Sequence, residues 1–69
     1  MKVFGDRLRE LRIEKGLSQE KLAKELNNKI TSSAIAFWEL GQRIPKFDSV
    51  IIIAQYFGVS TDYLAGLED

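Results

Sequence analysis

Three places in this 69-residue sequence combine a helix N-cap with a hydrophobic staple, and they constrain the fold more than any other feature. In each, an apolar residue precedes Ser or Thr, and a second apolar residue follows the hydroxyl four positions later. Such a hydroxyl accepts a hydrogen bond from the first helical turn, while the apolar pair sets the angle at which the chain enters the helix. The three patterns therefore predict three helix starts. They are Leu17-Ser18 with Leu22, Ile30-Thr31 with Ile35 and Val59-Ser60 with Leu64.

Apolar residues at helical spacing predict the rest of each helix. Phe4, Leu8 and Leu11 recur on one face ahead of Gly16, which suits the left-handed residue that ends a helix. Glycines stand in the same place after three of the other four predicted helices, at Gly41, Gly58 and Gly66. The expected helices are 4–15, 19–27, 32–40, 47–57 and 61–65.

The segment 47–57 is the ambiguous one, because Val50 and the three isoleucines after it are β-branched and would suit a buried strand. Spacing favours a helix, and no other segment offers a partner strand. One helical stripe holds Phe47, Val50, Ile51, Ala54 and Phe57. The prediction is a compact, all-α domain of five helices that occupies residues 1–69.

Composition excludes several classes of function. The sequence has no Cys and no His, which removes the soft metal ligands, the thiol nucleophile and His-based triads. No pair of carboxylates is placed to converge in a pocket, so we expect neither an enzyme nor a metal, cofactor or small-molecule substrate. The first 16 residues lack the plan of a signal peptide, and no apolar run approaches a membrane span, which favours a cytoplasmic protein without a membrane partner.

The charges balance over the whole chain but not along it. Ten basic and ten acidic residues give a formal net charge of zero. Residues 1–29 hold eight Lys or Arg against five Asp or Glu, a net charge of +3, and residues 30–69 hold two against five, a net charge of −3. The molecule is dipolar, either by chance in a mixed-charge surface or because one face meets a polyanion.

Helices 19–27 and 32–40 are short, consecutive and joined by a brief turn, which is typical of a helix-turn-helix over about 18–40. Three blocks resemble the Cro/phage-repressor type of helix-turn-helix domain, the XRE-like group, over about residues 4–66. They read GLSQEKLA at 16–23, IAFWELGQRIP at 35–45 and GVSTDYLAG at 58–66. The resemblance implies a domain that binds operator double-stranded DNA, generally as a homodimer, in transcriptional regulation and most often as a repressor.

That resemblance makes 31–40 the recognition helix, which enters the major groove. A helical wheel places Thr31, Ala34, Ile35 and Trp38 inward; Ser33, Ala36, Phe37 and Leu40 lie outward, with Ser32 beside them. Base edges are read by hydrogen bonds, which suit Ser32 and Ser33, and by contact with thymine methyl groups, which suits Ala36 and Phe37.

The outward face lacks the Gln, Arg, Lys and Asn that the family favours for reading bases. An alternative follows from its apolar character. Phe37 and Leu40 would then pack on another protein, and the chain would be an interaction module or an antitoxin-like subunit on the same fold.

Phosphate contacts are expected from the start of helix 19–27 and from the loop after the recognition helix. The resemblance assigns a phosphate to Gln19, where helix N–H groups favour anions. Gln42 and Arg43 match the family's phosphate clamp, and Lys46 adds a cation beside them. The alternative for these loop cations is an ordinary solvated surface.

Two further features are compared with the family, one that matches it and one that departs from it. Glu39 matches a structural acid of the family and is expected to pair with Arg12 in a partly buried ion pair. The turn departs from the family pattern, because Asn27, Asn28 and Lys29 replace a glycine and lengthen it by two residues. Asn tolerates the left-handed conformation, so a longer turn is feasible.

Ile52 and Tyr56 form an apolar pair beside the main stripe of helix 47–57. We interpret them as a dimer or partner surface, with cover by helix 61–65 and the N-terminus as the alternative. Domains of this kind often precede a sensing or dimerising region, so Leu67–Asp69 is either a natural end or the beginning of a further segment.

Overall fold

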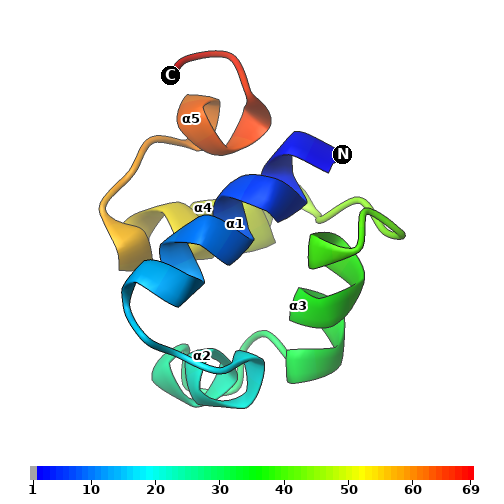
Figure 1. Cartoon of the computed structure of the whole chain (residues 1–69), viewed down its shortest axis with the longest axis vertical. Coiled ribbons are helices and arrows are strands. Elements are labelled where there is room, and N and C mark those ends of the chain that lie inside the picture. Colours follow the sequence, from blue (N-terminus) through cyan, green and yellow to red (C-terminus); the bar gives the residue numbers. More distant parts are fainter. Residues whose placement is uncertain (1) are drawn as a thin grey trace.

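The computed structural model describes residues 2–69, and in this range it forms five α-helices and no strand (Figure 1). The predicted fold class is therefore confirmed. The helices are α1 (Lys2–Glu14), α2 (Gln19–Glu25), α3 (Ser32–Glu39), α4 (Phe47–Phe57) and α5 (Thr61–Ala65). None of those in the described range is long and apolar enough to cross a membrane.

The hydroxyl caps are present at the three predicted starts. Ser18, Thr31 and Ser60 are the N-caps of α2, α3 and α5, and each has extended backbone angles. Each side chain accepts a hydrogen bond from the backbone N–H three residues later, at 3.0, 3.1 and 2.9 Å respectively. Because these helices have only five to eight residues, a satisfied first turn is a large part of their local stability.

The helix ends share one hydrogen-bonding pattern, in which a residue with positive φ reverses the chain. At α3 this residue is Gly41, with φ of 73°, and Gln42 N–H donates back to Phe37 O at 2.9 Å. At α2 the same place is taken by Asn27, with φ of 56°, and Asn28 N–H donates to Ala23 O at 3.0 Å. These are Schellman motifs. The prediction that α2 continues to residue 27 is wrong, because Asn27 replaces the usual glycine as the stop.

One hydrophobic core takes a fully buried side chain from every helix. These residues are Phe4 and Leu8 from α1, Leu22 from α2, Ile35 from α3, Ile53 from α4 and Leu64 from α5. In α4 the inward stripe is Val50, Ile53 and Ala54, while Phe47 is 70% exposed. The prediction that Phe47 lies on the core stripe is wrong: Phe47 is the first residue of α4, and the buried stripe begins one turn later, at Val50.

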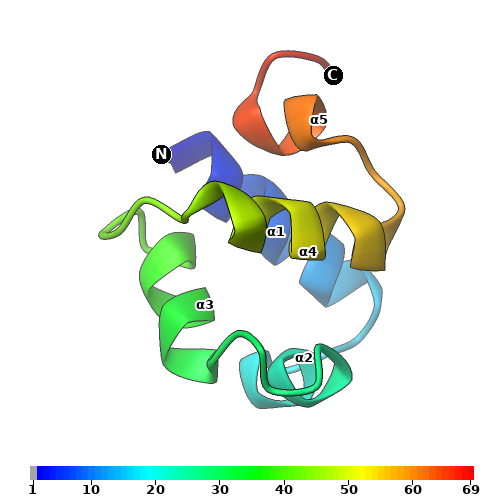
Figure 2. The ribbon, with the colours of Figure 1, turned by 180° about the vertical axis from the view of Figure 1, so that it is seen from behind.

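The helix-turn-helix and the C-terminal helix lie at opposite ends of the molecule. Figure 1 shows α2 and α3 at the lower end, α1 across the middle, and α5 with the C-terminus at the upper end. Figure 2, from behind, shows α4 crossing the other side of α1. Arg7 of α1 ties down the upper end, because its guanidinium donates to the backbone carbonyls of Tyr63 and Glu68 and lies 4.3 Å from the Tyr63 ring centroid.

The start of α1 packs unusually closely on the end of α3. Gly5 is buried, and a Cβ placed on it would lie far inside van der Waals distance of the Trp38 carbonyl oxygen. Beside this contact the Phe4 and Trp38 rings meet edge to face, with centroids 5.7 Å apart. The absence of a side chain at Gly5 thus lets α1 support α3 directly.

Gly5→Ala is expected to lower the free energy of unfolding by at least about 3 kcal/mol, because the added methyl group meets backbone that cannot move aside. Gly16→Ala is the matched control: a Cβ there meets open space, so only the positive φ of 70° is strained, at about 1 to 2 kcal/mol. Urea denaturation followed by the fluorescence of Trp38, the only tryptophan, measures both. Equal losses would show that α1 and α3 do not approach as closely as described.

Candidate nucleic-acid interface

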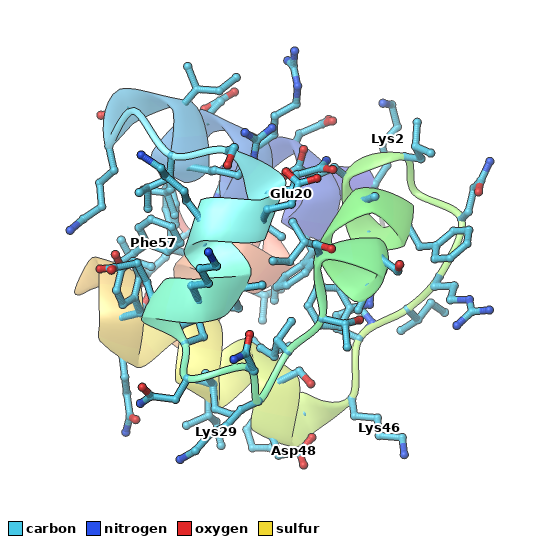
Figure 3. The ribbon with its side chains drawn as sticks, turned by 90° about the horizontal axis from the view of Figure 1, so that it is seen from below. Lys2, Glu20, Lys29, Lys46, Asp48 and Phe57 are labelled. Atoms are coloured by element: carbon cyan, nitrogen blue, oxygen red, sulfur yellow. The ribbon has the colours of Figure 1, made fainter. Side chains whose placement is uncertain are left out.

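The helix-turn-helix consists of α2, a turn over residues 26–31 and α3. Figure 3, which views the molecule from below, shows α2 and α3 side by side on the near surface. The turn contains two consecutive left-handed residues, Asn27 and Asn28, with φ of 56° and 59°, and it then buries Ile30 in the core. The two left-handed Asn residues therefore allow the longer turn to reach the Thr31 cap without a glycine.

An ion pair between Arg12 and Glu39 joins the first helix to the third. Arg12 Nε donates to Glu39 Oε2 at 2.7 Å and Arg12 Nη2 donates to Glu39 Oε1 at 2.9 Å, which is a bidentate pair. The side chains are only 13% and 5% exposed. A third donor, Arg12 Nη1, reaches Leu17 O at 2.8 Å. The hydrogen bond to Glu39 raises the pKa of Arg12 although burial opposes this, so the guanidinium stays charged.

Gln19, at the start of α2, is part of the same network. Its Nε2 donates to Glu39 Oε1 at 3.1 Å. The second proton on Nε2 and the oxygen of the Gln19 amide take no part in this hydrogen bond. The residue expected to contact a phosphate is thus anchored in one orientation by the acid of α3.

The outward side of α3 is largely apolar, as the wheel predicted. Ser33 is exposed, whereas Ser32, Ala36 and Phe37 are half-buried. Leu40, which caps the helix, is 69% exposed. The inward residues Ile35 and Trp38 are buried and Ala34 is half-buried, as predicted.

Thr31 departs from its predicted inward position on that wheel. The residue is exposed, because its hydroxyl is held at the helix end to cap the N–H of Ala34. The cap therefore holds the Thr31 side chain at the helix end, outside the core, with its oxygen accepting from Ala34 N–H.

The loop after α3 carries the remaining predicted contacts. Gln42, Arg43 and Lys46 are all exposed. The Schellman turn at Gly41 folds the loop back along α3, and the Arg43 guanidinium lies 4.5 Å from the centroid of the Phe37 ring. This cation–π contact connects a predicted phosphate-binding residue to a predicted base-contacting residue.

A shallow depression of about 360 Å³ lies where α1, α2 and α3 meet. The residues that line it are Arg9, Arg12, Gln19, Ala36, Glu39 and Leu40. Sequence reasoning did not select Arg9, although its i, i+3 relation to Arg12 placed both on one side of α1. Since Glu39 is already paired, Arg9 adds positive charge at the edge of α3.

Ile52 and Tyr56 lie away from α3. Both are half-buried and pack against the core. The Tyr56 hydroxyl donates to Glu25 Oε1 at 3.0 Å, and Lys15 Nζ lies 4.9 Å from its ring centroid. Burial and the hydrogen bond to Glu25 raise the pKa of Tyr56. Glu25 of α2 and Lys15, which follows α1, therefore cover part of the Tyr56 side chain, and part of each side chain stays accessible.

Comparison with known families agrees with this geometry. The model of a family described as helix-turn-helix matches residues 8–64, which include all of the depression and the loop after α3. This chain belongs to the helix-turn-helix family. The resemblance to the XRE-like group stated from the sequence blocks is thus confirmed.

Several helix-turn-helix regulators resemble nearly the whole chain. The transcriptional activator BcrR of Enterococcus faecalis is 36% identical over 66 residues, which cover 96% of this chain and 31% of that protein. The transcriptional regulators YobD and ImmR of Bacillus subtilis (strain 168) are each 34% identical and cover 97% and 96% of the chain. The chain spans 58% and 50% of those two relatives. No solved structure is a significant match.

Replacing Arg12 by Ala is expected to lower the free energy of unfolding by about 3 kcal/mol, because it leaves the Glu39 carboxylate buried without its cation. Lys2→Ala is the control, since the Lys2–Asp6 pair is 3.5 Å long and exposed. Its loss should lower the free energy of unfolding by about 0.5 kcal/mol or less. Urea denaturation of both variants gives the comparison. Equal stability of the Arg12 variant and the parent would contradict the structural role of this pair.

Proposed function

We propose that this helix-turn-helix domain binds double-stranded DNA as a sequence-specific transcriptional regulator, with repression as its mode. The observation that carries the proposal is the arrangement of α3: its outward side remains partly accessible, with Ser33 and Leu40 exposed, and the cations Arg9 and Arg43 lie beside it. The relatives are named as HTH-type transcriptional regulators, which supports activity at DNA, and we propose the cytoplasm as its location.

Phosphate contacts would come from both sides of α3. Gln19 offers the free proton of its anchored amide at the start of α2, and Gln42, Arg43 and Lys46 offer exposed donors in the loop. Contacts of this kind position a protein on the duplex but carry no sequence information. They also explain how a chain of zero net charge binds a polyanion, because the local cations rather than the total charge face the DNA.

Base contacts would come from the outward side of α3. Ser32 and Ser33 supply hydroxyls at its start, and Ala36 and Phe37 supply apolar surface one turn further on. An α-helix fits the major groove, where donors, acceptors and thymine methyl groups distinguish the base pairs. We therefore assign α3 the role of recognition helix.

We also propose a homodimer on DNA. Ile52 and Tyr56 remain a candidate contact surface, but Ile44 and Phe47 are 73% and 70% exposed and offer more uncovered apolar area. Two-fold dimers of helix-turn-helix domains read half-sites about one helical turn apart.

A protein-interaction or antitoxin-like module is the second candidate function. The exposed side chains of Leu40 and Ile44, next to the recognition helix, favour it, since such apolar groups often mark protein contacts. The two candidates differ in salt dependence, because only DNA binding releases counterions from phosphates.

Arg43→Ala is expected to weaken binding to all duplexes alike and to make the slope of log K against log salt shallower by about 0.9, the value for one lost phosphate contact. Lys15→Ala is the matched control, because Lys15 is a cation away from α3. Its ammonium lies over the Tyr56 ring, which packs on Phe57, and Figure 3 shows Phe57 on the far side of α2 from α3. Fluorescence anisotropy at several salt concentrations measures both. An unchanged slope for the Arg43 variant would remove this residue from the phosphate contacts.

Selection of preferred sites from random duplexes is expected to return two related half-sites whose centres are about 10 base pairs apart. Phe47→Ser should weaken binding to the paired site more than binding to a single half-site, because it removes dimer contacts and leaves α3 intact. Ile52→Ser, assayed in parallel, tests the other candidate surface. Recovery of single, unpaired sites would argue against the homodimer.

A further inference from the structure

The outward side of α3 has few groups that can read hydrogen-bonding patterns. Its hydroxyls are confined to the start of the helix, at Ser32, Ser33 and the Thr31 cap, whose oxygen accepts from Ala34 N–H. The next outward turn presents Ala36 and Phe37, which have no side-chain donor or acceptor. The only charged residue in α3, Glu39, is bound to Arg12 and Gln19. The middle of the helix can therefore recognise only shape and apolar groups.

The ring of Phe37 is held in a defined position. The Schellman turn directs the loop back over α3, and the Arg43 guanidinium lies against the ring, 4.5 Å from its centroid. The ring is half-buried, so the helix supports part of it and part remains accessible. A pre-positioned aromatic surface loses little conformational entropy when it contacts a ligand.

The apolar feature of the major groove is the methyl group at C5 of thymine. Cytosine carries hydrogen at the same position, and 5-methylcytosine carries the same methyl group as thymine. Uracil is thymine without that methyl group. A reader that contacts only the methyl group distinguishes thymine from uracil and 5-methylcytosine from cytosine.

We propose that Phe37, with Ala36 beside it, is a sensor of pyrimidine C5-methyl groups, so that methylation of cytosine at the contacted position strengthens binding. This rests on the proposed DNA-binding function and names the chemical feature that the recognition helix reads. DNA is favoured over a protein ligand for this surface because Arg43 covers one side of the ring, Lys46 follows in the same loop and Arg9 borders Ala36 in the depression. That border of cations complements phosphates on either side of a methyl group.

The test uses the best duplex from site selection and replaces each thymine in turn by deoxyuridine, which removes only the methyl group. One or two positions in each half-site should lose about three- to fivefold in affinity, the effect of one buried methyl group. At such a position a C·G pair should bind more weakly, and 5-methylation of that cytosine should restore about three- to fivefold.

Phe37→Gln tests the residue itself. The variant should bind thymine and deoxyuridine duplexes equally, because the aromatic surface that contacts the methyl group is gone. Leu67→Gln is the matched control, since Leu67 is an exposed apolar residue near the C-terminus, at the opposite end from α3, and it should keep the full response to deoxyuridine. Circular dichroism checks that both variants are folded.

The outcomes separate this inference from the proposed function. If the parent binds thymine and deoxyuridine duplexes with the same high affinity, or if Phe37→Gln keeps the parent's response, methyl sensing is overturned while DNA binding stands. If no duplex binds even at low salt, the proposed function itself fails, and the apolar side of α3 is then assigned to a protein partner.

Discussion

The bidentate contact between Arg12 and Glu39 holds α3 in place against α1. A nearly buried carboxylate requires a cation and further donors, and the structure supplies them to Glu39 of α3 from two other helices, through Arg12 on α1 and Gln19 on α2. The remaining Arg12 donor holds the Leu17 carbonyl just before the Ser18 cap. One ionic group therefore fixes the start of α2 relative to α3, which is the geometry that a helix-turn-helix needs to place both on one duplex.

Three of the helices, α2, α3 and α5, are too short to be stable alone. Helices of five to eight residues are far below the length at which an isolated helix persists in water. Caps and Schellman turns specify where each begins and ends, and the shared core stabilises them together. Gly5 belongs to this shared packing, because it allows α1 to rest on the backbone of α3.

Affinity and specificity are separated on the surface. Cations in the α3 loop and on α1 face outward beside a helix whose own side is apolar, and the acid in that helix is neutralised within the protein. Phosphates and methyl groups are the two features of DNA that we propose this surface complements. The cation–π contact between Arg43 and Phe37 links the exposed cations of the loop to the apolar side of α3.

The sequence by itself determined the helix-turn-helix membership. It also determined the three N-caps and the glycine stops, because each of these depends on hydrogen bonds between residues within five positions of one another. It placed Arg12 opposite Glu39 only through the family resemblance. The tertiary structure alone decided that Phe47 is exposed, that Arg9 borders α3 and that Tyr56 is bonded to Glu25. These contacts depend on the angles at which whole helices pack, and helical periodicity specifies a face of each helix but not the neighbour that covers it.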